Sequence, residues 1–418
     1  MIQARSASRR LRVLLSEGAS TSAREAMTVL GLAGHSVDVC DPDAHCLARF
    51  SRFVSRFHRC PGLARNPAAF LRFIENLLAT ERFDVLLPIH EQGFLLSRVP
   101  LRIAANVGIA LPDFSDYRTA HSKLGFSRLL DELALPQPVT HVARSDAELR
   151  AAVRFPCMIK TPIGTASRGV WLVRDAIALT QALEELNAKE GLADGVLVQD
   201  FVAGATEKAQ AVFCRGKLLG FHAFRQIAAG AGGGDARKES VRRPNVRAHV
   251  ARIGKHLRWH GALSVDYILP PAEAMPLYID CNPRLVEPMS AYLAGVDLVD
   301  LLLRISLGET PAAAPDSRAG VRTHLAMQAL LGCALRGGRR RDVVRESIEL
   351  LAGRGVYADS VEELTPVRVD WLSAVPLVMT AILLTVAPRL AKSLATGGWG
   401  AHLVDARSAR LIGDDKFA

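Results

Sequence analysis

The stretch Tyr278-Ile-Asp-Cys-Asn-Pro-Arg284 alternates polar and apolar residues, and Ser264-Val-Asp-Tyr-Ile268 does the same just upstream. This alternation predicts two neighbouring β-strands with a proline-rich connection between them. Asp280 and Asn282 are two residues apart and share one face of their strand, and we expect Asp266 on the other strand to lie near them. Such oxygen donors suit a Mg²⁺ ion that also holds phosphate groups. A turn closed by a side-chain hydrogen bond is the plainer alternative.

Length and composition indicate a large globular protein. The 418 residues are 49% hydrophobic and 22% charged, which is enough for two or three domains with real cores. The net charge of +10 favours anionic partners such as a nucleotide, a nucleic acid or an acidic membrane. Seven scattered cysteines without CxxC spacing indicate a reducing compartment, and Leu11–Leu15 is too short for a signal-peptide core. We therefore expect a cytoplasmic protein.

The N-terminal region alternates strands with helices, which predicts a small parallel α/β domain over residues 10–115. The expected strands are 12–15, 36–40 and 83–88, and the expected helices are 22–32 and 67–80.

Arginines and phenylalanines interleave between Arg49 and Arg59. Such a stripe can be a surface for nucleic acid, but it is more typical of an amphipathic connector with its phenylalanines turned inward. The sequence contains no nucleic-acid motif, so we expect no nucleic-acid partner.

A second region begins with a helix over 123–133 and continues with the strand Cys157–Lys160, the loop Thr161–Val170 and the strand Val170–Val173. Glycines and hydroxyls in this loop can approach phosphate oxygens, although the spacing is not that of a Walker P-loop and a hairpin without a ligand is the alternative. Lys160 favours the first interpretation, because a lysine at an inward strand end needs an anionic partner.

Further strands are expected at 196–202, from Glu207 to Phe213 and at 217–222, and a helix at 245–259. Between them, the glycine-rich segment Gly230–Ser240 predicts either a mobile lid or a flexible tip.

The order of these features resembles the ATP-grasp superfamily, in its carbamoyl-phosphate-synthase-like and biotin-carboxylase-like branch of carboxylate ligases. The resemblance is strong over 116–310 and loose over 10–115. It implies an N-terminal parallel α/β domain (10–115), an ATP-grasp domain (116–310) and a mainly helical extension (311–418). Within the grasp, 116–200 would form a small lid subdomain and 201–310 the metal and substrate subdomain.

The resemblance also implies which residues surround ATP. Two lysines would contact the phosphates, the glycine loop would cover them, a hinge would lie under the adenine, and an acid would meet the ribose. In that order these residues are Lys123 and Lys160; Gly164, Thr165, Ser167 and Gly169; Gln199, Asp200, Phe201 and Val202; and Glu207.

For the metal, the resemblance implies Asp266, Asp280 and Asn282 as ligands of Mg²⁺, with Mn²⁺ as an alternative. Lys160 and Arg284 would be catalytic, and Arg284 would steady the transferred phosphoryl group. Two features depart from the family: Asp280 stands where Glu is commoner, and Leu285-Val-Glu-Pro-Met289 replaces a small, Gly/Ser-rich stretch.

The function implied is an ATP-dependent carboxylate–amine (or thiol) ligase that acts through an acyl-phosphate on small-molecule substrates. A non-catalytic, ATP-binding regulatory protein at a membrane surface is the alternative, and a homodimer is left open.

The segment Trp371–Pro388 carries no charge and is near the lower length limit for crossing a bilayer. Its proline and hydroxyl residues favour a buried or interfacial helix over a span, and peripheral membrane contact is left open.

Overall fold

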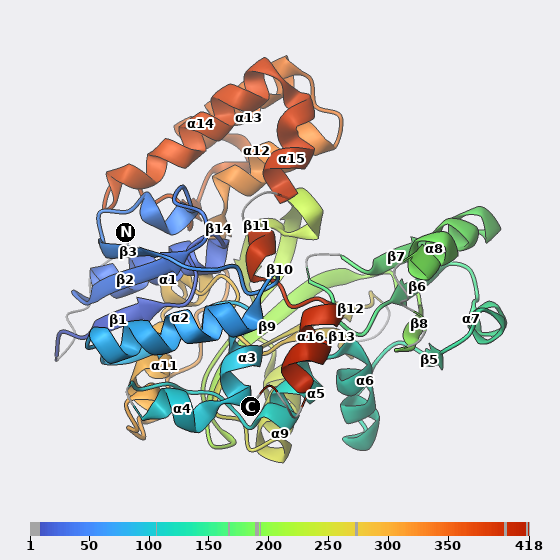
Figure 1. Cartoon of the computed structure of the whole chain (residues 1–418). Coiled ribbons are helices and arrows are strands. Elements are labelled where there is room, and N and C mark those ends of the chain that lie inside the picture. The colour runs from blue at the N-terminus through green and yellow to red at the C-terminus, as the bar shows by residue number, and fades with distance from the viewer. Residues whose placement is uncertain are drawn as a thin grey trace.

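A computed structural model describes residues 9–105, 107–165, 168–188, 192, 194–271, 275–396, 399–414 and 417. The described strands form three sheets, and a group of C-terminal helices lies beside them (Figure 1).

The first sheet is parallel and has the order β3-β2-β1-β4. Its strands are β1 (Arg12–Leu15), β2 (Ser36–Asp41), β3 (Val54–Arg59) and β4 (Val85–Leu87). The helices α1 (Thr21–Leu32) and α2 (Pro67–Thr80) connect them, and α3 (Gln92–Arg98), α4 (Pro100–Ala104), α5 (Phe114–His121) and α6 (Lys123–Glu132) follow. Val and Leu side chains of the central strands are buried, as a parallel sheet requires. The predicted α/β region is confirmed.

Strand β3 corrects the interpretation of the arginine–phenylalanine stripe. The phenylalanines are partly buried as expected, but the second half of the stripe is an edge strand and not a connector. The Arg49 guanidinium lies 4.6 Å from the centre of the Phe57 ring, so the two side chains form a cation–π contact within the chain.

The second sheet is small and antiparallel, with the order β5-β8-β6-β7. Its strands are β5 (Thr140–Ala143), β6 (Cys157–Lys160), β7 (Val170–Val173) and β8 (Val196–Asp200). With α7 (Asp146–Ala152) and α8 (Ala176–Ala188) it encloses a core of its own, which includes Ile159, Val173 and Leu183. It projects to one side of the molecule in Figure 1.

The third sheet has seven strands in the order β13-β12-β9-β10-β11-β14-β15. Its strands are β9 (Ala205–Cys214), β10 (Lys217–Ala229), β11 (Asp235–Ser240), β12 (Gly261–Leu269), β13 (Leu277–Asn282), β14 (Arg322–His324) and β15 (Ser360–Glu362). All neighbours are antiparallel except β14 and β15. The helices α9 (Pro244–His256), α10 (Met289–Leu293) and α11 (Leu298–Ser306) accompany this sheet.

The glycine-rich segment is only partly a loop. Asp235–Ser240 is strand β11, in the interior of the sheet, so the predicted lid or tip is confined to the residues before it. The strand was not recognised because its inward residues include Asp235 and Lys238, which are buried as ion pairs.

The C-terminal region is mainly helical, with α12 (Ala326–Leu335), α13 (Arg340–Ala352), α14 (Ala374–Val386), α15 (Ala391–Thr396) and α16 (Ala406–Gly413). The first four lie together at one end of the molecule in Figure 1, whereas α16 packs against α2 and α3. Helix α14 is half-exposed: Thr380 and Leu384 are buried, and Ile382 is 58% exposed. No helix in the described ranges is long and apolar enough to span a membrane.

Candidate active site

Asp266, Asp280 and Asn282 lie on one face of the seven-stranded sheet. In the register of β12 and β13, Asp266 is opposite Asp280 and Ser264 is opposite Asn282. The side chains of the three residues are partly exposed, and Cys281 between them is buried on the other face, as expected from alternation. The register of the two strands thus puts the three predicted oxygen donors on one face of the sheet.

Two lysines from different elements reach the same strand. Lys123 opens helix α6; its Nζ lies 3.2 Å from Oδ2 of Asp280 and donates to the carbonyl of Gly164 at 2.6 Å. Lys160 ends β6, and its Nζ donates to the carbonyl of Ile279 at 3.0 Å. Both lysines are buried, so their charges face this site and not bulk water.

Burial and neighbouring charges shift two of these groups. Burial lowers the pKa of Lys160 to about 8; Asp280 opposes this shift and the charge of Lys123 adds to it. Burial raises the pKa of Asp266 to about 6; Lys208 opposes this shift and Asp280 adds to it. A further cation near Asp266 and Asp280 would relieve their mutual repulsion.

The loop between β6 and β7 lies over this region. Gly164 is the residue whose carbonyl Lys123 binds, and the hydroxyl of Thr165 donates to the carboxylate of Glu91. Gly169 has φ +69°, which favours glycine, and its carbonyl accepts from Thr161 N at 2.8 Å. Ser167 lies outside the described residues.

The predicted hinge is the end of β8. Gln199 is buried, donates to Thr140 Oγ1 at 3.0 Å and has an amide oxygen without a hydrogen-bond partner. Asp200 and Val202 are partly exposed, and Phe201 is 40% exposed. One buried acceptor without a partner and one exposed apolar side chain thus lie at the same strand end.

Glu207 does not belong to this arrangement, which corrects its predicted contact with a ribose. Alternation turns Lys208 and Gln210 of β9 toward Asp266 and Ser264, so Glu207 points to the opposite face. There it is 1% exposed and binds Arg243 through both carboxylate oxygens, at 2.6 and 2.7 Å. Tyr267 also donates to it at 2.9 Å, so no free acceptor is left for a ligand.

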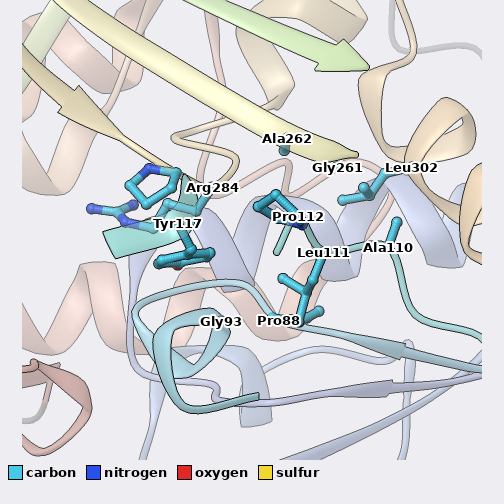
Figure 2. Close-up of a pocket in the computed structure, with 11 residues that line it drawn as sticks. Pro88, Gly93, Ala110, Leu111, Pro112, Tyr117, Gly261, Ala262, Arg284 and Leu302 are labelled. Atoms are coloured by element: carbon cyan, nitrogen blue, oxygen red, sulfur yellow. The ribbon is translucent and has the colours of Figure 1, made fainter. Parts of the chain in front are cut away.

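Arg284 borders a small pocket, seen in Figure 2. Its backbone N–H donates to the carbonyl of Asn282 at 2.8 Å, and its Nη2 lies 3.4 Å from the amide oxygen of that residue. Tyr117 lies beside it in the pocket, and its buried hydroxyl has no hydrogen-bond partner. The pocket therefore offers one cation and one free hydroxyl next to the strand that carries Asp280 and Asn282.

Sequence reasoning missed several charged residues on the same face of the sheet. Lys208 binds Asp235 at 2.6 Å, and Lys238 binds Glu287 at 2.6 Å and Glu363 at 2.7 Å. A lysine in a polar stretch such as Arg237-Lys-Glu-Ser240 looks solvated or free for a substrate carboxylate, yet Lys238 is 1% exposed and already paired. No local signal marks this lysine as buried, because β11 has the sequence DARKES and lacks a regular alternation of apolar and polar residues.

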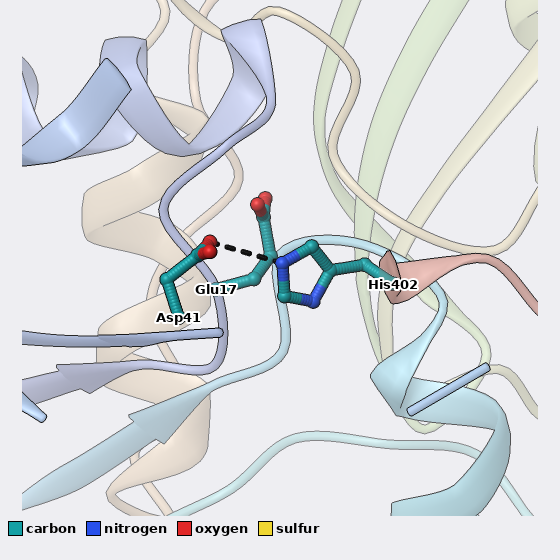
Figure 3. Close-up of side chains that lie close together, drawn as sticks. All are labelled: Glu17, Asp41 and His402. Atoms are coloured by element: carbon teal, nitrogen blue, oxygen red, sulfur yellow. Dashed lines mark hydrogen bonds and ion pairs between the residues drawn. The ribbon is translucent and has the colours of Figure 1, made fainter. Parts of the chain in front are cut away.

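A separate buried group joins the C-terminal segment to the first sheet: Glu17, Asp41 and His402 (Figure 3). His402 Nε2 lies 2.9 Å from Asp41 Oδ2, and its Nδ1 lies 3.0 Å from Gln92 Nε2. Backbone N–H groups of Gly18, Ala19, Ser20 and Asp43 donate to the two carboxylates. Because hydrogen bonds within the chain satisfy these atoms, we assign the group a structural role: it holds the C-terminal segment against the first sheet.

Known proteins resemble this chain in sequence and in fold. No protein-family model matches the chain. The carbamoyl phosphate synthase large chain of Thermus thermophilus is 29% identical over 249 residues, which are 53% of this chain and 23% of that protein. That of Deinococcus radiodurans is 25% identical over 205 residues, which are 46% of this chain and 20% of that protein. The matches thus span about a quarter or less of these relatives' length.

Solved structures agree over more of the chain. N5-carboxyaminoimidazole synthetase from Staphylococcus aureus, complexed with ADP, has a TM-score of 0.60 at 11% identity, covering 79% of this chain and 86% of that chain. L-amino acid ligase from Bacillus licheniformis has a TM-score of 0.58 at 14% identity, covering 76% and 81%. The biotin carboxylase domain of Hydrogenobacter thermophilus 2-oxoglutarate carboxylase, with MgADP and bicarbonate, has a TM-score of 0.59 at 14% identity, covering 75% and 74%. The chain shares the fold of these three solved structures.

Proposed function

We propose that the protein is an ATP-dependent, ADP-forming ligase that joins a small-molecule carboxylate to an amine, or to a thiol, through an acyl-phosphate. The observation that carries the proposal is the convergence on β13: Asp280 and Asn282 with Asp266 beside them, and Lys123 and Lys160 within hydrogen-bond reach of the same strand. The nucleotides and the ligase activities named for the related structures support it.

The three oxygen donors fit Mg²⁺, and Mn²⁺ by the same chemistry. They are two carboxylates and an amide on adjacent strands, and the charge of Asp280 raises the pKa of Asp266 further. When bound, the ion would neutralise charge on the nucleotide phosphates.

The chain's own residues would position the nucleotide. Lys123 and Lys160 would bind its phosphates, under the loop that holds Gly164, Thr165, Ser167 and Gly169. Gln199, Asp200, Phe201 and Val202 would hold the adenine by backbone and side-chain groups at the end of β8. Positioning and charge neutralisation are the main contributions of a protein to phosphoryl transfer.

Arg284 would bind the carboxylate substrate and then the phosphoryl group transferred to it. A carboxylate is a poor electrophile, and phosphorylation gives it a good leaving group that the incoming amine displaces as phosphate. The pocket beside Arg284 and Tyr117 lies next to the metal-facing strand, as this sequence of steps requires. We also propose the domain bounds 10–115, 116–310 and 311–418 for this assembly.

The test is ADP release from the full chain with ATP, Mg²⁺ and mixtures of small carboxylic acids and amines. Asp280→Ala is expected to reduce acid-dependent release by at least about 100-fold, because the ion and Lys123 lose their shared carboxylate. Asp316→Ala, which changes an aspartate that is 62% exposed, is the matched control and keeps the wild-type rate. Circular dichroism checks both folds. Undiminished release from the Asp280 variant rules out the metal assignment, and nucleotide binding without acid-dependent release would favour a regulatory protein.

We further propose that α14 contacts an anionic membrane surface. One side of this helix exposes apolar side chains, and Trp371 before it is 65% exposed. The exposed members on α14 are Val378, Met379, Ile382, Leu383 and Val386. Residues 371–404 contain no acidic side chain, and exposed Arg368 and Arg389 flank the helix. An apolar stripe between cations is the composition of a helix that lies in a lipid interface.

Co-sedimentation with phosphatidylserine-containing vesicles tests this contact. Ile382→Asp is expected to abolish binding, while Ile177→Asp, which changes a residue that is 73% exposed on α8, is expected to retain it. Equal behaviour of the two variants contradicts the proposal. If sedimentation velocity instead shows a dimer that Ile382→Asp dissociates, the helix is covered by a second copy of the chain.

A further inference from the structure

Three glutamates from different parts of the chain surround one buried lysine. Lys238 of β11 binds Glu287, which follows β13, at 2.6 Å and Glu363, which follows β15, at 2.7 Å. Glu25 of α1 lies close enough for its charge to act on Glu363, Lys238 and Glu287. We call Glu25, Glu287, Glu363 and Lys238 the glutamate cluster. All four residues are less than 10% exposed.

The glutamate cluster has three carboxyl groups for one ammonium group. Lys208 and Asp235 nearby pair with each other at 2.6 Å, so they do not supply the missing cation. Buried carboxylates are stable only when they are paired or protonated. Burial, followed by the charge of Glu363, raises the pKa of Glu25 well above its ordinary value, which is the expected response to a missing positive charge.

Hydrogen-bond acceptors in this region also lack donors. Oε1 of Glu25 and Oε1 of Gln210 are buried without a hydrogen-bond partner. Neither ring nitrogen of His222 has a partner, and this histidine is fully buried with a pKa lowered to about 3 by burial and by Lys238, so it is neutral and leaves one acceptor nitrogen and one N–H donor unpaired. A ligand that fits here must bring donors, and an ammonium group brings three and no acceptor.

The glutamate cluster lies on the same face of the sheet as the metal-facing residues. Gln210 is opposite Ser264 on β12 and opposite His222 on β10, and Ser264 is opposite Asn282. The amide nitrogen of Gln210 donates to the carbonyl of Val286 at 2.6 Å, which ties this row to the segment after Arg284. Within that segment Glu287 has φ +54°, a conformation that residues other than glycine rarely adopt and that is frequent at ligand sites.

A metal ion suits the glutamate cluster less well than an organic cation. Among the described residues, the three glutamates are not a set whose oxygens all lie within 4.8 Å of one another, whereas Glu17, Asp41 and His402 are.

We propose that the glutamate cluster is the subsite for an ammonium group of the ligase's substrate, so that one of the two compounds it joins is a free amino acid. The inference rests on the proposed function for its place in catalysis. Glu363 comes from the C-terminal region, beyond the part of the chain that resembles the ATP-grasp family, so this region contributes directly to substrate choice.

The experiment measures the melting temperature of the full chain with MgADP and each of the common L-amino acids, in the free and the N-acetylated form. Acetylation removes the positive charge and leaves the carboxylate. At least one free amino acid is expected to raise the melting temperature by about 2 °C or more, and its N-acetyl form is expected to leave it unchanged. No shift with any free amino acid, or equal shifts with both forms, overturns the proposal without any variant.

Variants locate the site. Glu363→Gln and Glu25→Gln are each expected to remove the shift, because each removes one of the carboxylates. Glu239→Gln is the matched control: Glu239 neighbours Lys238 on β11, points to the opposite face and pairs with exposed Arg225 and Arg322. A shift retained in Glu363→Gln and Glu25→Gln, or lost in Glu239→Gln, contradicts the location.

The experiments distinguish a failure of the proposed ammonium subsite from a failure of the proposed ligase function. Asp280→Asn is expected to stop ADP release and to keep the shift caused by the amino acid. Absence of ADP release from the wild type with a persistent, acetylation-sensitive shift would refute the ligase and leave the ammonium site. ADP release that depends only on acids and amines without an amino-acid ammonium would refute the site and leave the ligase.

Discussion

The ammonium of Lys123 lies 3.2 Å from the carboxylate of Asp280, so a helix of one part of the chain is tied to the metal-facing strand of another. A divalent ion at Asp280 and a phosphate at Lys123 would separate these two charges and give each a stronger partner. The two side chains thus pair with each other through the same groups that we propose bind a phosphate and a metal ion.

Lys123→Met is expected to weaken the binding of MgADP by at least about 10-fold, because charge-assisted hydrogen bonds to phosphate are among the strong ones. Isothermal titration calorimetry measures this affinity. Lys255→Met, which changes an exposed lysine at the end of α9, serves as the control and keeps the wild-type affinity. Equal affinities in the two variants would remove Lys123 from the nucleotide site.

The affinity for nucleotide is expected to fall as the pH rises through about 8, the value to which burial lowers the pKa of Lys160, because the neutral amine no longer attracts phosphate. Lys160→Met should bind weakly and without this pH dependence. The lowered pKa of Lys160 affects the stability of the fold in the opposite direction from nucleotide affinity. Between about pH 8 and the ordinary value of 10.5 the unfolded chain holds more protons at this lysine, so its contribution to the free energy of unfolding rises with pH.

Gly169→Ala is expected to impair the loop over the phosphates. A Cβ at this residue would lie 2.1 Å from Thr161 Oγ1, and its φ of +69° is unfavourable for alanine. We expect at least a several-fold loss of nucleotide affinity with a small change in melting temperature. Gly413→Ala, where a Cβ meets nothing within 4 Å, should behave as the wild type. Unchanged affinity in Gly169→Ala would detach the loop from nucleotide binding.

Asp370→Ala is expected to destabilise the protein by about 3–5 kcal/mol, because it leaves the buried guanidinium of Arg24 without its 2.7 Å partner. Urea unfolding gives the free energy. Asp316→Ala breaks the exposed pair with Arg247 and should cost about 1 kcal/mol or less. Similar losses in the two variants would show that the Arg24 pair does not hold the C-terminal region in place.

The alternation of polar and apolar residues predicts that Asp280 and Asn282 share one face of their strand, because side chains two residues apart point to the same side. The neighbouring strand then brings Asp266 to that face. The family resemblance implied a ribose contact for Glu207, but the side chain lies on the opposite face of β9, where Arg243 and Tyr267 hold it. Lys160 was identified because a lysine that ends an apolar strand needs a partner.

Other features could not be read locally. Strands β14 and β15 have three residues each, too few for a recognisable pattern; β14 pairs with the edge of β11, and β15 then pairs with β14. Lys238 and Glu363 are 125 residues apart in the sequence, and they form an ion pair only in the folded protein. Buried ion pairs between distant segments are specified by tertiary structure, so no window of sequence announces them.

The pairing of β14 with β11 limits how this protein can be divided. A fragment cut after the part that resembles its relatives would lose the strand that covers β11 and would present unpaired backbone groups to other molecules, which invites aggregation. It would also leave Arg24 and Lys238 without carboxylates on which they depend. Chimeras that exchange the C-terminal region between homologues should therefore keep the donor's matching residues on α1 and β11, since Arg24 and Lys238 pair there with Asp370 and Glu363.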